Sequence, residues 1–510
     1  MSVKIVYQDI AAGAAEDAAA TTQDAKPFCS PDRLPFEEEN AVPLASLEPN
    51  HWLLDGSREI VDGQDIRFWS AAMSDADGVF ETPPEISITF TARYTSPGVF
   101  LRFDAASGEY CTCVTVQWRR GEALLAEETF QPDSAEYFCS QTVEAYDRIT
   151  FRLHATNLPY RYAKLSQVVF GVTRVFLRDE LRNVKITAEV SIISSEIAVN
   201  TLDFTLDSEE NLAYMFQLKQ PVSAYDGDRL IGVFYIDSAT HRAAELYDVS
   251  CIDAVGVLDE DQFPAAVYDG YPVRALLEEI LDGHFDLLLD ASLSASTMTG
   301  YIPECSRREA LQQVAFALCA IVDTSGTGAI RVYKDRENTP SRFPLNRAYT
   351  GGSVETSAIV TAVRVTAHTY SLTGSGNDTV QAGGKTYYHT TAITTINNPK
   401  ATASDKQNVI EIDGATLVNP GNVPAVAQHI YDYYTKRERQ SAKIVMNGEQ
   451  PGDRIAMSTP WGSLISGYLT RMNIVLSGIA AADCEVIGTE VNAVGEPEIR
   501  YSGEFFAGGI

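Results

Sequence analysis

Alternation of apolar and polar residues over short segments is the feature that most constrains the fold of this chain. Residues 86–90 read Ile-Ser-Ile-Thr-Phe, and residues 113–118 read Cys-Val-Thr-Val-Gln-Trp. Successive side chains of a β-strand point to opposite faces, so this pattern predicts strands with one buried face. Turn-forming clusters, such as Ser-Pro-Gly at 96–98, separate the segments. Many short strands with such turns predict a β-sandwich or jelly roll over residues 46–176.

Two further parts of the chain show other patterns of apolar and polar residues. Residues 177–265 alternate again and are predicted to be β. Residues 266–350 contain the clearest helical patterns, one of them starting at Pro272. A second helix is predicted from Ser306, because Glu309 completes a capping box with it. Two helices and a few strands predict a small α+β insert between β segments.

The remaining segments are less regular. Residues 1–45 begin with a strand-like piece and continue with an Ala-, Thr- and Asp-rich stretch, which predicts an arm or flexible loop. Residues 351–371 return to strand, and the polar residues 372–421 predict a hairpin arm or an exposed loop. Residues 422–510 predict a helix followed by strands. Asn422 is the expected helix cap, with a proline in the first turn.

Length and charge exclude several functions. A chain of 510 residues with 45% hydrophobic content is expected to form about three or four domains. The net charge of −30 argues against binding nucleic acid through its phosphates, which needs clustered Lys and Arg. No apolar run is long enough to predict a membrane span, and the N-terminus lacks a signal-peptide core. The eight cysteines contain no CxxC pair, so free thiols are predicted.

An ordered set of segments carries a resemblance to a known module. It starts with Leu-Glu-Pro-Asn-His-Trp-Leu-Leu-Asp-Gly-Ser at residues 47–57 and continues through residues 68–70, 83–90, 98–104 and 164–171. In this order the segments resemble the galactose-binding-like (discoidin-type) module in tail proteins of phages and prophages of Gram-positive bacteria. The resemblance implies that residues 46–176 form a jelly roll.

A second resemblance covers roughly residues 180–500 as a pattern of elements. Residues 230–238 end in Tyr-Ile-Asp-Ser and residues 246–254 contain Cys-Ile-Asp, as in hub proteins at the tail tip of long-tailed phages and related contractile systems. It implies a first hub β-barrel at 177–265, completed by 351–371, and a second barrel at 422–510. The expected fold class is therefore mainly β with a small α+β part.

The hub resemblance also implies an assembly. A homotrimer with two barrels per chain would form a ring of six similar units around an axial channel. The implied partners are a distal tail or tail-tube protein, a tape-measure protein, and other baseplate or receptor-binding proteins. The protein would be made in the bacterial cytoplasm and reside in the virion tail tip. Its exposed barrel edges would be covered only on assembly.

Catalytic patterns are not found in the sequence, so no enzyme activity and no cofactor are predicted. The 7 histidines form no HExxH motif, and no GxSxG elbow occurs. For binding, the aromatic residues Trp69, Tyr110 and Trp118 are candidates to stack on sugars. Trp69 lies inside the family segments, where core packing is the competing interpretation. Asp55 is the candidate ligand for a structural Ca²⁺.

A different class of function also fits the jelly roll. The chain could be a carbohydrate-binding adhesin or cell-wall-directed protein that recognises a host wall glycan. That alternative predicts a monomer or simple dimer with polar loop residues beside exposed aromatics, whereas the hub hypothesis predicts a trimer.

Overall fold

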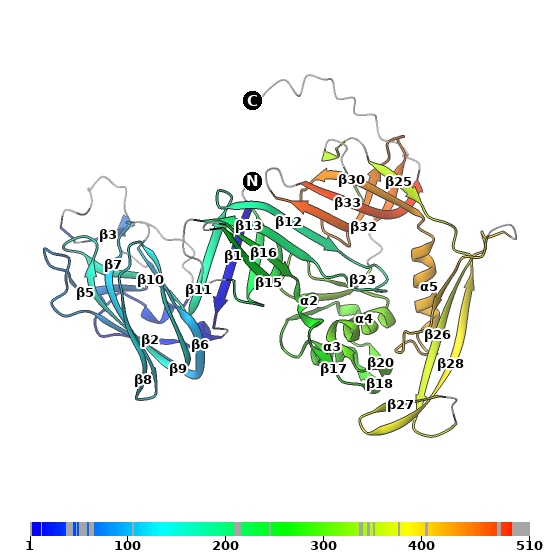
Figure 1. Ribbon diagram of the computed structural model, residues 1–510, viewed down its shortest axis with the longest axis horizontal. Helices are drawn as coiled ribbons and strands as arrows, with labels where there is room; N and C mark the ends of the chain where they lie inside the picture. Colours follow the sequence, from blue (N-terminus) through cyan, green and yellow to red (C-terminus); the bar gives the residue numbers. More distant parts are fainter. Residues whose placement is uncertain are drawn as a thin grey trace, which may run out of the picture. The chain divides into compact units, whose positions relative to one another are not determined.

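The computed structural model shows a mainly β chain with short helices, which confirms the predicted fold class (Figure 1). Contacts divide the chain into two compact units. The small unit comprises Val6–Val175 and Glu210–Pro221, and the large unit comprises Met1–Ile5, Phe176–Glu209 and Val222–Ile510. The structure describes residues 3–11, 13–36, 44–46, 48–49, 51, 59–60, 66–104, 107–208, 216–243, 246–335, 340–343, 347–349, 352–375, 378–402, 406–476 and 481–491.

A seven-stranded sheet dominates the small unit, in the region predicted to be a jelly roll. Its path is β5-β10-β6-β9-β7-β8, and a short strand, β2, also pairs with β6. The strands are β5 (Phe68–Met73), β10 (Tyr162–Val169), β6 (Glu85–Phe103), β9 (Glu136–Thr156), β7 (Cys111–Arg120), β8 (Ala123–Phe130) and β2 (Ala19–Thr21). A separate pair of short parallel strands consists of β3 (Leu44–Ala45) and β4 (Glu59–Ile60).

Large aromatic side chains fill the core of the small unit. Trp118, Tyr146 and Phe151 have no exposed surface. The Tyr146 hydroxyl donates a hydrogen bond to Ser96 Oγ over 3.1 Å, so its polar end is satisfied inside the core. Burying aromatic rings of this size stabilises the unit by about 1.5–3 kcal/mol each.

The described residues of the N-terminal segment form short regular elements, which corrects the prediction of an arm or flexible loop over residues 1–45. Its described elements are β1 (Val3–Ile10), α1 (Ala14–Asp17) and η1 (Pro31–Arg33), besides β2 and β3. Ala20 pairs with Ile88 on β6 and is nearly buried. Asp17 accepts hydrogen bonds from the backbone N–H groups of Thr91 and Ala92, each 2.9 Å long. Small alanines fit against the sheet without any apolar stripe, so periodicity could not reveal this packing.

One continuous sheet joins distant parts of the large unit. Within this unit the path runs β14-β15-β16-β13-β12-β32-β33-β30-β25, and β24 and β31 pair beside β32. The strands are β14 (Pro221–Asp226), β15 (Arg229–Ala243), β16 (Leu246–Ile252), β13 (Thr201–Asp207), β12 (Leu181–Glu189), β32 (Leu464–Val475), β33 (Ala481–Val491), β30 (Glu438–Val445), β25 (Ser353–Thr356), β24 (Ser341–Arg342) and β31 (Arg454–Ser458). Boundaries between the units fall within three strands, β1, β14 and β11 (Gly171–Leu177).

This sheet differs from the two separate barrels of the prediction. β12 pairs antiparallel with β32, so that Ile186 lies opposite Ile474. Strands from 177–265 and from 422–510 therefore share one hydrogen-bonded sheet. The segment 351–371 was predicted to complete the first barrel, but β25 pairs with β30 instead. Pairing between segments so far apart depends on three-dimensional contacts that alternation alone does not encode.

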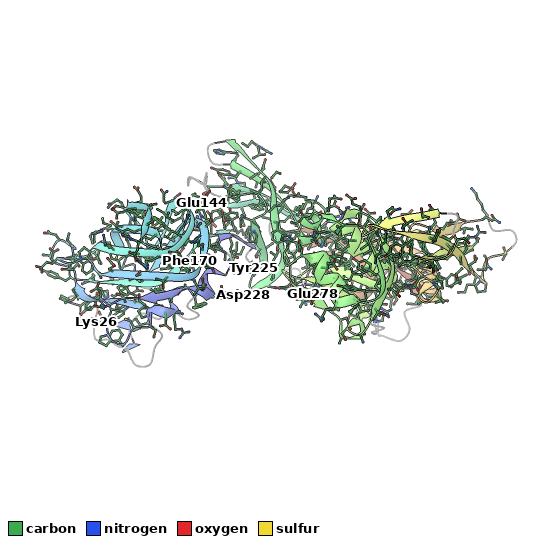
Figure 2. All side chains as sticks on the ribbon, turned by 90° about the horizontal axis from the view of Figure 1, so that it is seen from below. Lys26, Glu144, Phe170, Tyr225, Asp228 and Glu278 are labelled. Carbon is green, nitrogen blue, oxygen red and sulfur yellow. The ribbon has the colours of Figure 1, made fainter. Side chains whose placement is uncertain are left out.

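The α+β insert starts earlier than the predicted bound of residue 266, with α2 (Ala254–Leu258), and continues with α3 (Val273–Leu281), a short 3₁₀ turn, η2 (Ala291–Leu293), and α4 (Arg307–Leu318). Its short strands pair as β17–β21, β18–β20 and β19–β23–β22. Their bounds are β17 (Gln262–Phe263), β18 (Ala266–Pro272), β19 (Leu287–Leu289), β20 (Thr297–Ile302), β21 (Cys305–Ser306), β22 (Ala320–Asp323) and β23 (Ile330–Lys334). Leu276 and Ile280 on α3 are fully buried, whereas Glu278 lies on its exposed side (Figure 2).

The predicted capping box of the insert is confirmed. Ser306 accepts a hydrogen bond from the backbone N–H of Glu309, and the Glu309 side chain accepts one from the Ser306 N–H. These bonds satisfy two donors that the first helical turn would otherwise leave unpaired.

A buried aspartate joins the insert to the large sheet. Asp253, which caps α2, accepts a hydrogen bond from Thr324 Oγ1 over 2.8 Å and one from the Gly256 N–H. Asn200, just before β13, in turn donates to Thr324 Oγ1. Burial raises the pKa of Asp253 to about 6. The hydrogen bonds act in the opposite direction and only partly offset this rise.

A four-stranded sheet with the order β27-β28-β26-β29 follows the insert. Its strands are β26 (Ala362–Ser371), β27 (Asp378–Ala382), β28 (Lys385–Asn397) and β29 (Val409–Ile412). β26 therefore belongs to the sheet that contains the predicted arm, rather than to the first barrel. Helix α5 (Val423–Tyr434) packs Val426 and Ile430 into the same core as Val363 of β26. Asn422 precedes α5, but its side chain caps no helical N–H. It accepts from the N–H of Asn419 instead.

Candidate functional site

The aromatic residues predicted to bind sugars lie at very different depths. Trp118 is fully buried on β7, so no face of its ring can contact a sugar. Trp69 is 8% exposed and packs between Tyr162, with ring centroids 6.3 Å apart, and Phe28, at 5.8 Å. These two tryptophans are core residues, which corrects their assignment as sugar platforms. Tyr110 is half-buried and remains a prediction. Asp55, the predicted Ca²⁺ ligand, lies outside the described residues.

A buried ion cluster lies beside Trp69, and the sequence interpretation missed it. Lys164 Nζ is 2.7 Å from Glu48 Oε2 and 2.5 Å from Glu109 Oε2. Arg161 Nε is 2.9 Å from Glu109 Oε1, and His51 Nε2 is 3.2 Å from the same oxygen. All five side chains are at least nine-tenths buried. The sequence holds only one indication of this cluster: Glu48 and Lys164 belong to the first and last of the segments that carry the module resemblance.

Electrostatics explains how this cluster tolerates burial. Burial opposes ionisation of Glu48, but the nearby Lys164 ammonium and hydrogen bonds from Ser46 and the Tyr162 N–H hold its pKa below the usual range. Burial raises the pKa of Glu109, and Lys164 only partly offsets the rise. Such a network is costly to break, because removing one partner leaves an uncompensated charge in the interior.

Glu48, His51 and Glu109 place their ligand atoms within 4.8 Å of one another, a spacing that could suit a metal ion. However, Lys164 Nζ already occupies the space between the two carboxylates. A divalent cation would have to displace this ammonium and lie beside a guanidinium. The residues present fit a structural ion cluster better than a metal site.

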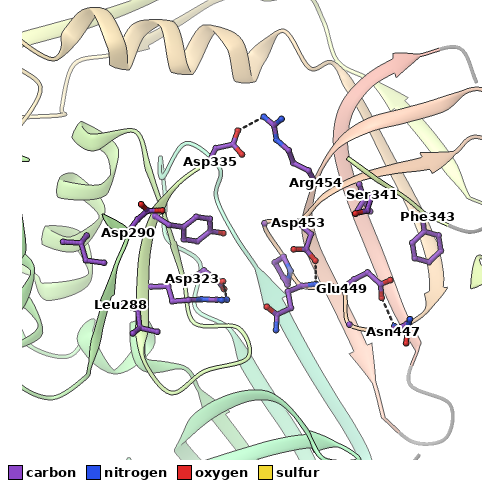
Figure 3. Close-up of a pocket in the computed structure, with 18 of the residues that line it drawn as sticks. Leu288, Asp290, Asp323, Asp335, Ser341, Phe343, Asn447, Glu449, Asp453 and Arg454 are labelled. Atoms are coloured by element: carbon purple, nitrogen blue, oxygen red, sulfur yellow. Dashed lines mark hydrogen bonds and ion pairs between the residues drawn. The ribbon is translucent and has the colours of Figure 1, made fainter. Parts of the chain in front are cut away.

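A charged recess of about 920 Å³ opens in the large unit (Figure 3). Residues of the insert line one side and the loop before β31 lines the other. Its charges include arginines at 274, 331, 342, 347 and 454 and acidic residues at 290, 323, 335, 449 and 453. Arg454 pairs with Asp335 over 2.7 Å, as the dashed line in Figure 3 shows. Arg331 likewise pairs with Asp323, and Arg347 with Glu449.

These pairs determine what the recess can do chemically. An arginine that is paired with a carboxylate is poorly available to bind a phosphate or to stabilise a developing negative charge. The recess is nearly charge-balanced on a chain whose net charge is −30.

The thiol groups carry no sign of a disulfide framework. All eight are free, as predicted. Burial raises the pKa of Cys305 and of Cys319 to about 11, so both remain protonated at neutral pH. None of the helices in the described ranges is long and apolar enough to cross a lipid bilayer.

Comparison with known proteins finds similarity among solved structures only. No protein-family model and no curated protein matches the chain. The chain is similar to a tail protein from Neisseria meningitidis MC58, with 12% identity, a TM-score of 0.45, and coverage of 60% of this chain and 91% of that one. It is also similar to a 43 kDa tail protein of prophage MuSo2 from Shewanella oneidensis, with 8% identity, a TM-score of 0.44, and coverage of 62% and 96%.

A prophage tail protein from Listeria monocytogenes EGD-e is similar to a comparable extent. Its identity to this chain is 9% and its TM-score is 0.42, with coverage of 63% of this chain and 92% of that one. These alignments record a partial likeness in fold.

Proposed function

We propose that the chain is a structural subunit of the tail tip, or baseplate hub, of a bacteriophage or phage-like particle. In this proposal three copies form a ring around an axial channel and join the tail tube to the tip. The role is structural rather than catalytic. Support comes from the two sequence resemblances, from their order along the chain, and from strand edges on the large sheet that are available for assembly.

The observation that carries the proposal is the outer half of β15. Residues Asp237–Ala243 are all exposed. β16 pairs with this half along one edge, for example through Ala239 with Val249. On the other side, β14 has six residues and joins β15 through a turn at 227–228, so it can accompany only the first part of β15. At Ala239 and Thr240, the only strand among the described residues that can accompany β15 is therefore β16, and the opposite side of this stretch is a template for pairing with another chain.

A second edge lies elsewhere in the same sheet. β25 ends the strand order and pairs only with β30 among the described strands. Its residues Ser353–Thr356 are mostly exposed. Pairing between two different edges of identical chains is a heterologous contact, which closes into a ring when the rotation per copy allows it. A ring of three copies would join the outer half of β15 in one copy to β25 in the next.

The other partners follow from this placement. A ring at the tail tip would contact a distal tail or tail-tube protein on one face, and further baseplate or receptor-binding proteins on the other. The tape-measure protein and the genome would pass through its channel. A channel built from acidic chains repels DNA phosphates, so DNA would pass without sticking. In this proposal the protein resides in the virion.

The mass of the purified chain in solution tests the proposal first. Light scattering is expected to give three times the chain mass of 55.7 kDa, and negative-stain images are expected to show a ring with a central hole. A monomer at all accessible concentrations would contradict self-assembly of this chain.

Two neighbouring proline substitutions sharpen the test at β15. Ala239 and Thr240 lie in a regular part of the β15–β16 ladder, where successive N–H groups point to opposite edges. One of the two substitutions, Ala239→Pro or Thr240→Pro, therefore removes only the N–H group that points away from β16, toward the proposed partner chain. The other removes an N–H group that donates to β16. The outward variant should reduce the mass to that of a monomer while the thermal midpoint of the isolated chain is retained. Unchanged trimers in both variants would exclude this edge.

A further inference from the structure

Trp461 differs from the buried tryptophans described above. It lies on the turn between β31 and β32 and is 61% exposed. A large aromatic ring on the surface can serve as a contact site, because covering its face with a ligand or partner is favourable. Neither the strand edges nor the proposed ring explains this exposure.

Hydrogen bonds hold the indole in one orientation. Trp461 Nε1 donates to Glu490 Oε1 over 2.7 Å, and Ser463 Oγ donates to the same oxygen. These bonds hold the pKa of the Glu490 carboxyl below its usual range, so the group is ionised at neutral pH. The N–H edge of the ring is satisfied, and the flat apolar surface remains the part that is exposed.

The backbone of the turn is also fixed. Thr459 and Ser463 bridge its base, with a 2.9 Å hydrogen bond from the Thr459 N–H to the Ser463 carbonyl and 2.7 Å between their hydroxyl oxygens. Gly462 has a φ of 94°, a conformation that other residues adopt only under strain. The platform is therefore organised before any ligand arrives, which lowers the entropy lost on binding.

We propose that Trp461, Glu490 and Ser463 form a binding site for a neutral saccharide, a hexose or N-acetylhexosamine unit of a polysaccharide. The C–H face of the pyranose ring stacks on the indole. Its hydroxyls donate to the Glu490 carboxylate and to Ser463 Oγ, whose own hydrogen is donated to Glu490. Within the described residues, Glu490 Oε2 has no hydrogen bond, so one carboxylate oxygen remains available to the sugar.

Polar neighbours favour a saccharide over a protein partner. A tryptophan that anchors a protein interface usually fits an apolar pocket and is surrounded by groups that exclude water. Here the groups bonded to the indole or to its turn are hydroxyls and a carboxylate. The same carboxylate, on a chain with a net charge of −30, disfavours anionic sugars such as uronic acids.

Saturation-transfer NMR on the full chain tests the site, because the method detects weak ligands of a large protein. The probes are methyl β-D-galactopyranoside, methyl β-D-glucopyranoside and the N-acetylglucosamine trimer at up to about 10 mM, with glucuronic acid as the anionic comparison. At least one neutral probe should bind, with a Kd on the order of 1 mM as expected for a single platform. Trp461→Ala should weaken that binding at least 10-fold, and Glu490→Gln about 3-fold or more.

Tyr349→Ala is the matched control, because Tyr349 is another exposed aromatic of the large unit, 47% exposed and remote in sequence from this turn. It should bind the probe as the wild type does. Circular dichroism should give all variants the same thermal midpoint, since neither ring lies in the core.

Several results would overturn the site. One is the absence of a signal from every neutral probe, and another is binding of a probe by Trp461→Ala as tight as that of the wild type. Loss of binding on Tyr110→Ala, with Trp461→Ala unaffected, would place the sugar in the small unit. A fall in oligomeric mass on Trp461→Ala would also overturn it, since it would make Trp461 a protein contact. The inference does not rest on the proposed function, because a monomer could bind the sugar and a trimer could fail to bind it.

Discussion

The two units differ in how far apart in the sequence their paired β-strands lie. In the small unit, all strands of the main sheet fall between residues 19 and 169, and its longest pairing joins β6 to β9. In the large unit, β12 pairs with β13 on one side and with β32 on the other, across most of the chain. The main sheet of the small unit is thus completed within residues 19–169, whereas the large sheet is completed by a segment near residue 470. A sheet closed within one continuous stretch predicts independent stability for the first unit, and the long-range pairing predicts shared stability for distant segments of the second.

The largest expected effect tests whether the small unit is stable by itself. Trp118→Ala removes a fully buried ring and should cost the small unit about 3–5 kcal/mol. Hydrogen exchange should then speed up across β7 and β9 while β12 and β32 keep their protection. Leu124→Ala, at a side chain that is 50% exposed, should change stability by less than about 0.5 kcal/mol. Equal loss of protection in both units would show that they unfold together.

The joint between the insert and the large sheet should respond to pH through Asp253. Its folded pKa of about 6 exceeds the usual 3.8, so the folded state holds the proton more tightly. Stability should rise by roughly 1–3 kcal/mol from this group as pH falls through 6, and the rise is complete below the unfolded pKa. Asp253→Asn removes the titration, so the difference in urea stability between variant and wild type should shrink from pH 7 to pH 4. Parallel pH profiles would contradict this assignment.

Gly488→Ala probes the shared stability of the large sheet. A Cβ at Gly488 would lie 2.3 Å from the Ser466 carbonyl oxygen on β32. The strands must move apart, at a cost of about 1–3 kcal/mol. Protection of Ile186 on β12 should fall together with that of β33, because β32 lies between them. Gly414→Ala, where a Cβ meets no atom within 4 Å, is the control. A loss confined to β33 would mean that the sheet frays locally.

The smallest effect should stay within the insert. Ser306→Ala removes the cap of α4 and should cost about 1 kcal/mol. Because Glu309 is the other half of the box, the double variant with Glu309→Ala should lose less than the sum of the two single losses. Exchange at α4 should accelerate without a change in β12. Additive losses in urea melts would show that the two side chains act independently.

Local rules explain what could be predicted from the sequence. The capping box at Ser306 needs only residues three apart, and the alternation at 86–90 needs only one strand, so both were found. The β12–β32 pairing was missed because neither strand carries a signal of its partner. The ion cluster was missed for a related reason, since Glu48 and Lys164 meet only after the small unit folds. Burial of Trp118 and exposure of Trp461 also depend on tertiary context, because a tryptophan in sequence is compatible with either.

The pairing of β12 with β32 has a consequence for biosynthesis. A ribosome releases β12 long before it reaches Leu464, and at roughly 5–20 residues per second the interval is on the order of tens of seconds. During this time the nascent chain carries an open strand edge that its own later segment must find. In a cell that makes many copies at once, neighbouring nascent chains compete for that edge. Correct yield should therefore depend on slow, dilute synthesis or on a chaperone that shields β12 until the last strands emerge.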